Sequence, residues 1–256
     1  MTETTLSLPG FTGTVMRPGD AAYDEARTVF NGLIDSRPAL IARCTSTSDV
    51  AAAVRYARAN NLTVSVYGGG HAVTGSAVAE GSLCVDLRGM KTADVDVESR
   101  TVRAAGGLTW GELDAATQEH GLAVTGGRVP STGVAGLALG SGSGWLERKC
   151  GFTCDNLLSA ELVTADGNVV TASDTDNPEL FWGLRGGGGN FGIVTTFTFA
   201  LHQIGPMVWG GMIIFPPQRA GEVMRAYRDF VAKAPDEVGS GLAFVTAPHE
   251  EFVPEP

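Results

Sequence analysis

The stretch YGGGHAVTG, residues 67–75, decides how the rest of this chain is interpreted. It directly follows LTVSVY (62–67), a short β-branched run that predicts a strand. Three consecutive glycines leave three backbone N–H groups without flanking side chains, and such a run can form a nest for an anion such as a pyrophosphate. His71 stands on the same loop and carries a nucleophilic nitrogen. Taken alone, the run is equally compatible with a glycine turn that carries a surface histidine.

A second glycine-rich segment, GGRVPSTGVAGLALGSGSGWLERKCGFTCDNL (126–157), is dominated by small residues for almost its entire first half, up to Trp145. Small residues let a backbone lie flat against a planar ligand, and neither a packed helix nor an ordinary strand needs so many of them. A long mobile loop is the alternative, but the interspersed apolar residues Val134, Leu137 and Leu139 disfavour it.

A third segment, RGGGGNFGIVTTF (185–197), contains a literal GxGxxG at Gly187, Gly189 and Gly192. A dinucleotide fingerprint of this form needs a helix directly after it, whereas the run IVTTFTF predicts a strand. The dinucleotide interpretation therefore fails on its context. The sequence also lacks the GxxxxGK[ST] pattern of a nucleoside-triphosphate phosphate loop.

The composition narrows the classes of protein. The 256 residues include 35 glycines, about twice the usual ~7%, and the formal net charge is −10. An acidic surface disfavours nucleic-acid binding but leaves a bound nucleotide open, because backbone N–H groups can hold phosphates. The first residues do not resemble a signal peptide, and no apolar run is long enough to span a membrane. Four cysteines without a CxxC pair, and histidines without metal-like spacing, predict reduced thiols, no metal site and a cytoplasmic location.

The order of predicted elements indicates a strand-rich α+β unit, followed by a segment with one further strand and one further helix. The predicted strands are 39–43, 62–67, 83–88, 191–202 and 208–217, and the predicted hairpins are 93–107, turning at Glu98-Ser99, and 157–173, turning at Asp166-Gly167. The predicted helices are a short one near 20–34, 50–61 with Thr47 or Ser48 as its cap, 109–121, 177–186 and 218–235.

The composition changes at Gly205-Pro206, so we expect a lead-in over 1–35, a main domain over 36–205 and a further segment over 206–256. One strand and one helix cannot form a core of their own, so this last segment is expected to be the incomplete start of another domain, cut short at the end of the chain. Its unpartnered apolar faces predict self-association.

In this order, the three glycine segments resemble the FAD-linked oxidases of the vanillyl-alcohol-oxidase superfamily, with their PCMH-type FAD-binding domain. The resemblance is strongest to the berberine-bridge-enzyme-like branch. It covers about residues 36–205, and the matching segments are 37–50, 67–75, 106–114, 126–157 and 186–195. It implies an α+β fold in which two α+β subdomains clamp an extended FAD, followed by the beginning of an α+β substrate domain.

The resemblance also implies a set of cofactor-binding residues, with His71 bonded covalently to the 8-methyl carbon of the flavin. The set is Tyr67, Gly68, Gly69, Gly70, His71, Ala72, Gly75, Val129, Pro130, Thr132, Gly133, Gly136, Leu137, Gly140, Gly142, Gly144, Trp145, Gly192, Ile193 and Val194.

Three positions depart from the pattern of that family. Val129 stands where some relatives carry a cysteine that bonds the flavin a second time, so covalent attachment is expected through His71 only. Tyr67 stands where arginine is common, which leaves the backbone nest to hold more of the phosphate charge. Cys150 stands where an aromatic residue is common, and we expect it to serve packing rather than chemistry.

The implied function is an FAD-dependent oxidase: hydride transfer from a small alcohol, sugar or secondary-metabolite substrate to covalently bound FAD, with oxygen as the electron acceptor. No catalytic base can be named, and His120, His202 and His249 are expected to be ordinary surface or edge residues. Two alternatives stay open. One is a binding module that holds FAD without turnover until a missing segment or a partner completes its pocket. The other is a relative with dissociable FAD and a different reaction, against which His71 argues.

Overall fold

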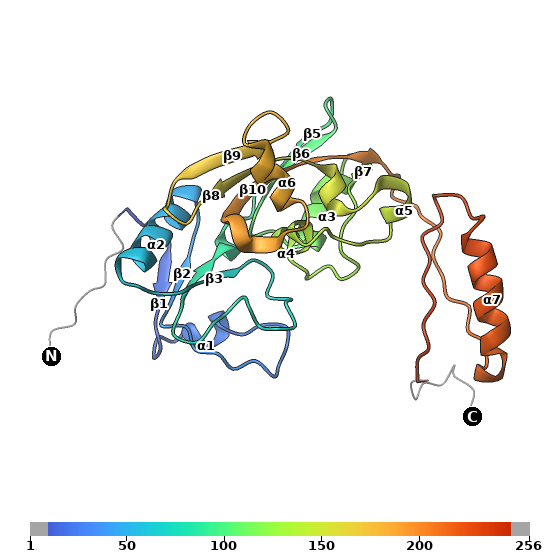
Figure 1. The fold of residues 1–256 in the computed structure, drawn as a ribbon, viewed down its shortest axis with the longest axis horizontal. Coiled ribbons are helices and arrows are strands. Elements are labelled where there is room, and N and C mark those ends of the chain that lie inside the picture. The colour runs from blue at the N-terminus through green and yellow to red at the C-terminus, as the bar shows by residue number, and fades with distance from the viewer. Residues whose placement is uncertain (1–9, 247–256) are drawn as a thin grey trace. The chain divides into compact units, whose positions relative to one another are not determined.

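The computed structural model describes residues 10–246, which divide into two compact units after Met207 (Figure 1). The sequence predicts a domain boundary after residue 205, close to this division. The first unit contains every glycine segment singled out above, a two-stranded sheet and two larger sheets, each of which has a core cluster packed against it. The second unit, from Val208 onward, is described separately below.

The smaller sheet has the strand order β1-β2-β4-β3. Its members are β1 (Thr14–Met16), β2 (Leu40–Arg43), β3 (Val64–Tyr67) and β4 (Leu83–Asp86). Strands β2 and β3 run parallel to β4, while β1, from the predicted lead-in, pairs antiparallel with β2. The parallel arrangement brings the ends of β3 and β4 to one edge of the sheet, so the glycine loop that follows β3 begins there.

Helix α2 (Thr47–Ala59) connects β2 to β3 and buries Val50, Ala53 and Ala57. Its cap is Ser46, which accepts a hydrogen bond from the Asp49 N–H, so the predicted caps Thr47 and Ser48 were wrong. The reason is local: Ser46 has extended dihedrals and its side chain reaches the third N–H of the helix, whereas Thr47 is already helical. The helix predicted near 20–34 is limited to α1 (Tyr23–Ala26).

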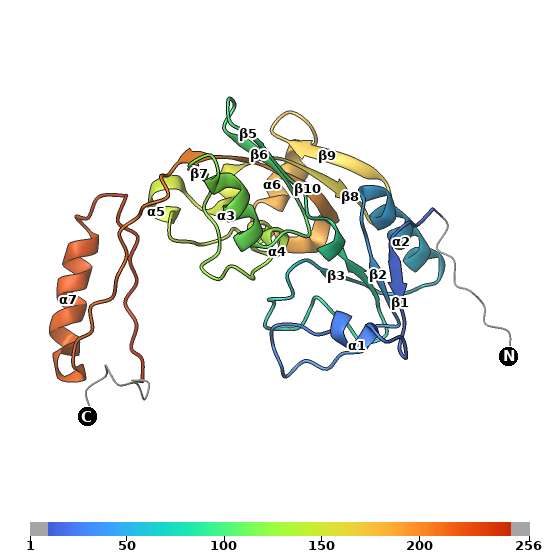
Figure 2. The same cartoon turned by 180° about the vertical axis from the view of Figure 1, so that it is seen from behind.

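The larger sheet is antiparallel, with the order β5-β6-β10-β8-β9 (Figure 2). The hairpin of β5 (Ala93–Asp96) and β6 (Thr101–Ala105) and that of β8 (Leu157–Val163) and β9 (Val169–Ser173) confirm both hairpin predictions. Strand β10 (Ile193–Ala200) lies between β6 and β8 and joins the two hairpins. The remaining elements of this unit are η1 (Leu87–Gly89), α3 (Trp110–Gln118), β7 (Leu122–Ala123), α4 (Val134–Leu139), α5 (Glu147–Cys150), η2 (Thr153–Asn156), α6 (Pro178–Leu184), η3 (Gly188–Phe191) and β11 (His202–Gln203).

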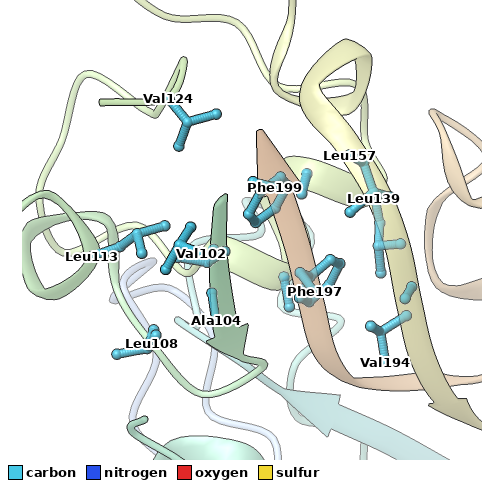
Figure 3. Packing of buried hydrophobic residues seen from close by; sticks show 14 of the residues in the cluster. Val102, Ala104, Leu108, Leu113, Val124, Leu139, Leu157, Val194, Phe197 and Phe199 are labelled. Carbon is cyan, nitrogen blue, oxygen red and sulfur yellow. The ribbon is translucent and has the colours of Figure 1, made fainter. Parts of the chain in front are cut away.

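The core of the larger sheet forms on the face that α3, α4 and α6 cover. Alternation along β10 places Phe197 and Phe199 on that face, with their rings stacked and their centroids 5.7 Å apart. Figure 3 shows them beside Val102 and Ala104 of the neighbouring strand β6. This core holds β10 in place, and with it the third glycine segment, which leads into β10.

The second glycine segment departs from its prediction, because it contains the short helix α4. Val134, Ala135, Ala138 and Leu139 are buried in this helix, so the expectation that no packed helix needs such a sequence was wrong. Small residues allow the helix to approach its neighbours closely, and alanine and leucine are strong helix formers. The third segment behaves as predicted, since strand β10 and no long helix follows its GxGxxG.

The second unit contains η4 (Pro217–Arg219) and α7 (Ala220–Val231), which confirms a helix within the predicted range 218–235. The strand predicted over 208–217 does not form, because no strand pairs with this segment in the described chain. Large apolar side chains are exposed here, among them Trp209, Met212, Ile213 and Phe244. The predicted self-association stays a prediction. Over residues 10–246, no helix combines the length and the apolar character needed to cross a membrane.

Asp86 at the end of β4 ties the smaller sheet together. Its side chain is fully buried and accepts hydrogen bonds at 2.9 Å from the Nε atoms of both Arg43 and Arg88. Burial alone raises the pKa of this carboxyl, but the two arginines outweigh it and hold the pKa below its usual value. A pKa that is lower in the folded state contributes stability above the unfolded pKa of ~3.9, and that stability is lost as the pH falls through the folded value.

We therefore expect Asp86→Asn to lower the free energy of unfolding at neutral pH by about 3 kcal/mol, because it leaves two arginines without their buried partner. The variant should also lose less stability than the wild type between pH 5 and ~2. Urea unfolding across this pH range measures both effects. The control is Asp94→Asn on the exposed face of β5, expected within ~0.5 kcal/mol of wild type, and equal stabilities of the two variants would contradict the role of Asp86.

Candidate cofactor site

A cavity of about 740 Å³ lies in the first unit, and the three glycine segments together form most of its lining. The loop after β3 contributes 68–72, the second segment contributes residues between Thr132 and Gly140, and the third contributes residues between Gly188 and Val194. Sites for small molecules and cofactors commonly have volumes of ~300–1,000 Å³, so this cavity has the size of such a site.

The first wall is the loop Gly68–Gly69–Gly70–His71. Gly70 has φ +69°, a left-handed conformation that glycine adopts without strain. Its carbonyl accepts the Phe30 N–H at 3.0 Å, which fixes the loop from behind. In the described part of the chain, the N–H groups of Gly69, Gly70 and His71 donate to no protein acceptor, so they are available to an anion.

The second wall approaches the first backbone to backbone. A Cβ on Gly69 would collide with the backbone of Gly133, and a Cβ on Gly133 would lie 2.8 Å from the Cα of Gly69. Backbone hydrogen bonds hold this wall against the start of α3: Trp110 donates to Thr132 and Val134 donates to Leu108, both at 2.9 Å. The two glycine segments therefore touch only because neither carries a side chain at the contact.

Helix α4 continues the second wall into the cavity. Gly136, Leu137 and Gly140 line it, and a Cβ on Gly136 would meet no protein atom within 4 Å. Gly136 thus leaves open a space that belongs to the cavity and not to the packing of the protein. The helix beside it is held by its buried face, which includes Val134 and Ala138.

The third wall is the entry into β10. Gly188, Gly189 and Asn190 of η3 line the cavity, together with Gly192, Ile193 and Val194. Gly192 has φ +146°, and a Cβ there would lie 2.6 Å from the Val163 carbonyl oxygen, so only glycine fits. The Asn190 Nδ2 donates to the Gly187 carbonyl at 2.9 Å and closes the turn.

The lining carries no Asp, Glu, Lys or Arg side chain among the described residues that form it. An anionic group in this cavity must therefore be held by backbone N–H groups and by the hydroxyl, amide and imidazole groups of the lining. The expectation that the backbone nest holds more of the phosphate charge stays a prediction. Over residues 10–246, no group of three His, Cys, Asp or Glu side chains is arranged to hold a metal ion.

His71 is the one titratable side chain among the described lining residues. Its Nε2 lies 2.9 Å from the Ser131 Oγ, and its ring stacks on Phe30 with centroids 4.4 Å apart and planes 17° from parallel. The histidine expected from the sequence thus lies in the lining of the same cavity as the glycine nest.

Thirteen of the predicted site residues line the cavity: Gly68, Gly69, Gly70, His71, Ala72, Thr132, Gly133, Gly136, Leu137, Gly140, Gly192, Ile193 and Val194. Seven lie outside its lining: Tyr67, Gly75, Val129, Pro130, Gly142, Gly144 and Trp145. One of the seven, Tyr67, packs behind the first wall. Tyr67 is buried, donates its hydroxyl to the Thr28 carbonyl at 2.8 Å and lies beneath the guanidinium of Arg88.

Sequence reasoning missed eleven lining residues: Val64, Ser65, Val66, Ser76, Ala77, Leu87, Ala135, Leu139, Gly188, Gly189 and Asn190. Gly189 belongs to the GxGxxG that was noticed but set aside, so a signal existed there. Ser76 and Ala77 extend the glycine loop beyond its motif and carry no chemical signature of their own.

The cysteines and the remaining histidines, which the sequence analysis did not assign to the site, lie outside the cavity lining or outside the described residues. Cys150 is buried outside the cavity lining, and burial raises the pKa of its thiol, which suits packing. All four cysteines are unpaired, and burial raises the pKa of Cys84 to about 12. His202 makes a 2.6 Å hydrogen bond with Asn156, His120 is exposed, and His249 lies outside the described residues.

Comparison with known proteins identifies the family. A family model described as "FAD binding domain" matches residues 38–173, which include the first two walls of the cavity. The chain belongs to this family of FAD-binding domains, and its relatives are FAD-linked oxidases and oxidoreductases. FAD is therefore the cofactor to be tested against the cavity.

Two of the relatives are nicotine oxidases. The (R)-6-hydroxynicotine oxidase of Paenarthrobacter nicotinovorans is 42% identical over 205 residues, covering 80% of this chain and 45% of the relative. The crystal structure of 6-hydroxy-D-nicotine oxidase from Arthrobacter nicotinovorans has a TM-score of 0.76 over 78% of this chain and 44% of its own.

Two further structures are more distant. BBE-like 1 of Physcomitrella patens has a TM-score of 0.74 at 33% identity and covers 77% of this chain and 43% of its own. The glucooligosaccharide oxidase of Acremonium strictum has a TM-score of 0.72 at 34% identity, over 75% of this chain and 41% of its own. The chain spans about half the length of the curated relatives it matches.

The cavity fits FAD by its own features. Three free N–H groups of the glycine loop suit a pyrophosphate, and glycines on all three walls leave room for a flat ring system close to the backbone. The N–H groups of Gly69, Gly70 and His71 would hold the phosphates, and the imidazole of His71 would lie beside the bound cofactor. When bound, FAD supplies the redox chemistry, which no side chain of the lining can perform.

Two alanine substitutions should distinguish a glycine that packs against the protein from a glycine that leaves room for a ligand. Gly133→Ala places a methyl group against the backbone of Gly69, and backbone cannot rotate away, so we expect a loss of ~1–3 kcal/mol in stability. Gly136→Ala meets no protein atom and replaces a helical glycine, so the protein without FAD should be as stable as wild type or ~0.5–1 kcal/mol more stable.

Gly136→Ala should nevertheless bind FAD more weakly than wild type, because its methyl group projects into the cavity. Thermal unfolding with and without FAD, together with flavin-fluorescence titration, measures both properties. Wild-type stability in Gly133→Ala, or wild-type FAD affinity in Gly136→Ala, would contradict this description of the walls.

Proposed function

We propose that this chain binds FAD covalently through His71 and serves an oxidase that acts on a small alcohol, sugar or secondary metabolite. The observation that carries the proposal is the position of His71, on the glycine loop and in the lining of the same cavity. A nucleophilic nitrogen that faces the cofactor is the group a covalent bond requires.

One relative supports a bond through histidine, and Val129 of this chain limits the expected number of bonds to one. The glucooligosaccharide oxidase of Acremonium strictum carries a 6-S-cysteinyl, 8α-N1-histidyl FAD, with one bond from a cysteine and one from a histidine. In this chain Val129 is half-exposed, lies outside the cavity lining and has no sulfur with which to form a thioether. One covalent bond, through His71, is therefore the proposal.

Bound FAD would accept a hydride from the substrate and pass the electrons to oxygen. The chain itself would hold the phosphates by backbone N–H groups, keep the cofactor in place through His71 and exclude water with the apolar residues Leu87, Leu137 and Ile193 of the lining. His71, which is proposed to bond the cofactor, carries the one basic group among the described lining residues, so substrate deprotonation is not assigned to this chain.

The second candidate is a module that holds FAD without turning over substrate. The observation that favours it is that no side chain of the described lining is assigned a step on the substrate. Oxygen consumption by the flavin-loaded chain, measured with panels of sugars, alcohols and cyclic amines, separates the two. Turnover of any class supports the oxidase, whereas bound flavin that no substrate reduces supports the module.

The covalent bond has a direct test. Acid precipitation of wild-type protein should leave yellow flavin in the pellet, and His71→Ala should release all of its flavin to the supernatant, because it lacks the nitrogen. His120→Ala, on an exposed residue outside the cavity lining, is the control and should retain flavin as wild type does. Flavin released from the wild type would remove the covalent role of His71 and leave non-covalent FAD binding in place.

A further inference from the structure

The imidazole of His71 is held on two sides by residues that are not among the predicted site residues. On its edge, Nε2 lies 2.9 Å from the Ser131 Oγ, and on its face the ring of Phe30 stacks at a centroid distance of 4.4 Å. Ser131 lies between the lining residue Thr132 and Pro130, in the second glycine segment. Phe30 belongs to the segment before β2. Three segments that are distant in the sequence thus meet at one ring.

Both partners are themselves fixed by the backbone. The Phe30 N–H donates to the Gly70 carbonyl at 3.0 Å, and the neighbouring Asn31 Nδ2 donates to the Val73 carbonyl at 2.8 Å, so this segment is tied to the glycine loop. The segment of Ser131 is held on each side, because Gly111 donates to Pro130 at 2.8 Å and Trp110 donates to Thr132 at 2.9 Å. The contacts of the ring are therefore built into the fold.

These contacts contribute little to the core. Phe30 is 68% exposed, an unusual position for a large aromatic ring, and Ser131 is exposed as well. Neither belongs to a buried cluster. Their common feature is the side chain of His71, so stability of the fold does not account for them.

We propose that Ser131 and Phe30 are positioning residues for covalent attachment of the cofactor. The inference rests on the proposed function. A neutral imidazole has one N–H and one lone pair, on different nitrogens. When the Nε2–H donates to the Ser131 Oγ, the lone pair lies on Nδ1, which has no protein partner among the described residues. The stack with Phe30 holds the plane of the ring, so that Nδ1 is kept in one direction.

The step that these residues serve joins the imidazole nitrogen to the 8-methyl carbon of FAD. One C–H bond of that carbon breaks, its hydrogen leaves as a proton, and an N–C bond forms. The carbon is oxidised by two electrons, and the ring system of the same FAD is reduced by two. Molecular oxygen then accepts the two electrons with two protons and becomes hydrogen peroxide, which restores the oxidised ring. Orientation of the nitrogen is the contribution of Ser131 and Phe30.

The test compares the rate of attachment with the affinity for FAD. Full-length chain purified without flavin, from cells starved of riboflavin, is mixed with FAD, and the flavin that survives acid precipitation is followed over time. Flavin fluorescence in the first seconds gives the non-covalent affinity. The variants are Ser131→Ala and Phe30→Ala, with Ser131→Thr and Phe30→Tyr as the conservative partners that keep the hydroxyl and the ring. Leu33→Ala, at an exposed residue of the same segment, is the control.

We expect Ser131→Ala and Phe30→Ala to attach FAD ~10-fold more slowly than wild type, with an unchanged affinity for FAD and unchanged thermal unfolding. The two conservative variants and Leu33→Ala should attach it within about twofold of the wild-type rate. A role in folding alone would change stability or affinity and would not distinguish alanine from the conservative residue.

Three results would overturn the proposal: wild-type attachment rates in both alanine variants, affinity losses that parallel the slower attachment, or conservative variants as slow as the alanine variants. A wild type that binds FAD but never retains it after acid would contradict the covalent bond itself, and the positioning role with it. Attachment that is normal in wild type and in every variant would contradict only the positioning role, so the two failures are distinguishable.

Discussion

The contact on which the site depends is the approach of two backbones at Gly69 and Gly133. Each occupies the space where the other would carry a Cβ, so the loop after β3 and the segment before α4 meet without any side chain between them. The loop continues strand β3 of the smaller sheet, and the segment is hydrogen-bonded to the start of α3, which covers the larger sheet. This contact therefore joins the two sheet layers at the cavity. The cavity, its open N–H groups and the position of His71 all follow from it.

The second constraint is electrostatic. The chain carries a formal charge of −10, and no described residue of its cavity lining has a charged side chain that could bind a phosphate. Buried charge is placed elsewhere, at Asp86, where two arginines neutralise it and strengthen the smaller sheet. An anionic cofactor therefore depends on backbone N–H groups, and on attachment through His71 if it is to be retained permanently. This explains why glycines and one histidine can form the whole chemical signature of the site.

Much of this was predictable from the sequence, because glycine runs and β-hairpins have local physical causes. The Asp166-Gly167 turn and the loop 67–75 were placed from a few neighbouring residues. Other features depend on packing that no local pattern reveals. The direction of the Tyr67 side chain, into the protein and under Arg88, is set by neighbouring segments. Helix α4 forms because its small residues fit between β-sheet and loop, and 208–217 lacks the partner that a strand needs.

The central claim is that FAD occupies the cavity between the three glycine segments, and hydrogen–deuterium exchange tests it most directly. Exchange of backbone amides is compared in the chain with and without FAD, peptide by peptide. The account predicts that FAD slows exchange at 68–72, 132–137 and 188–194, with little change in the turn 97–100. Protection confined to other segments, or none despite bound flavin, would contradict it.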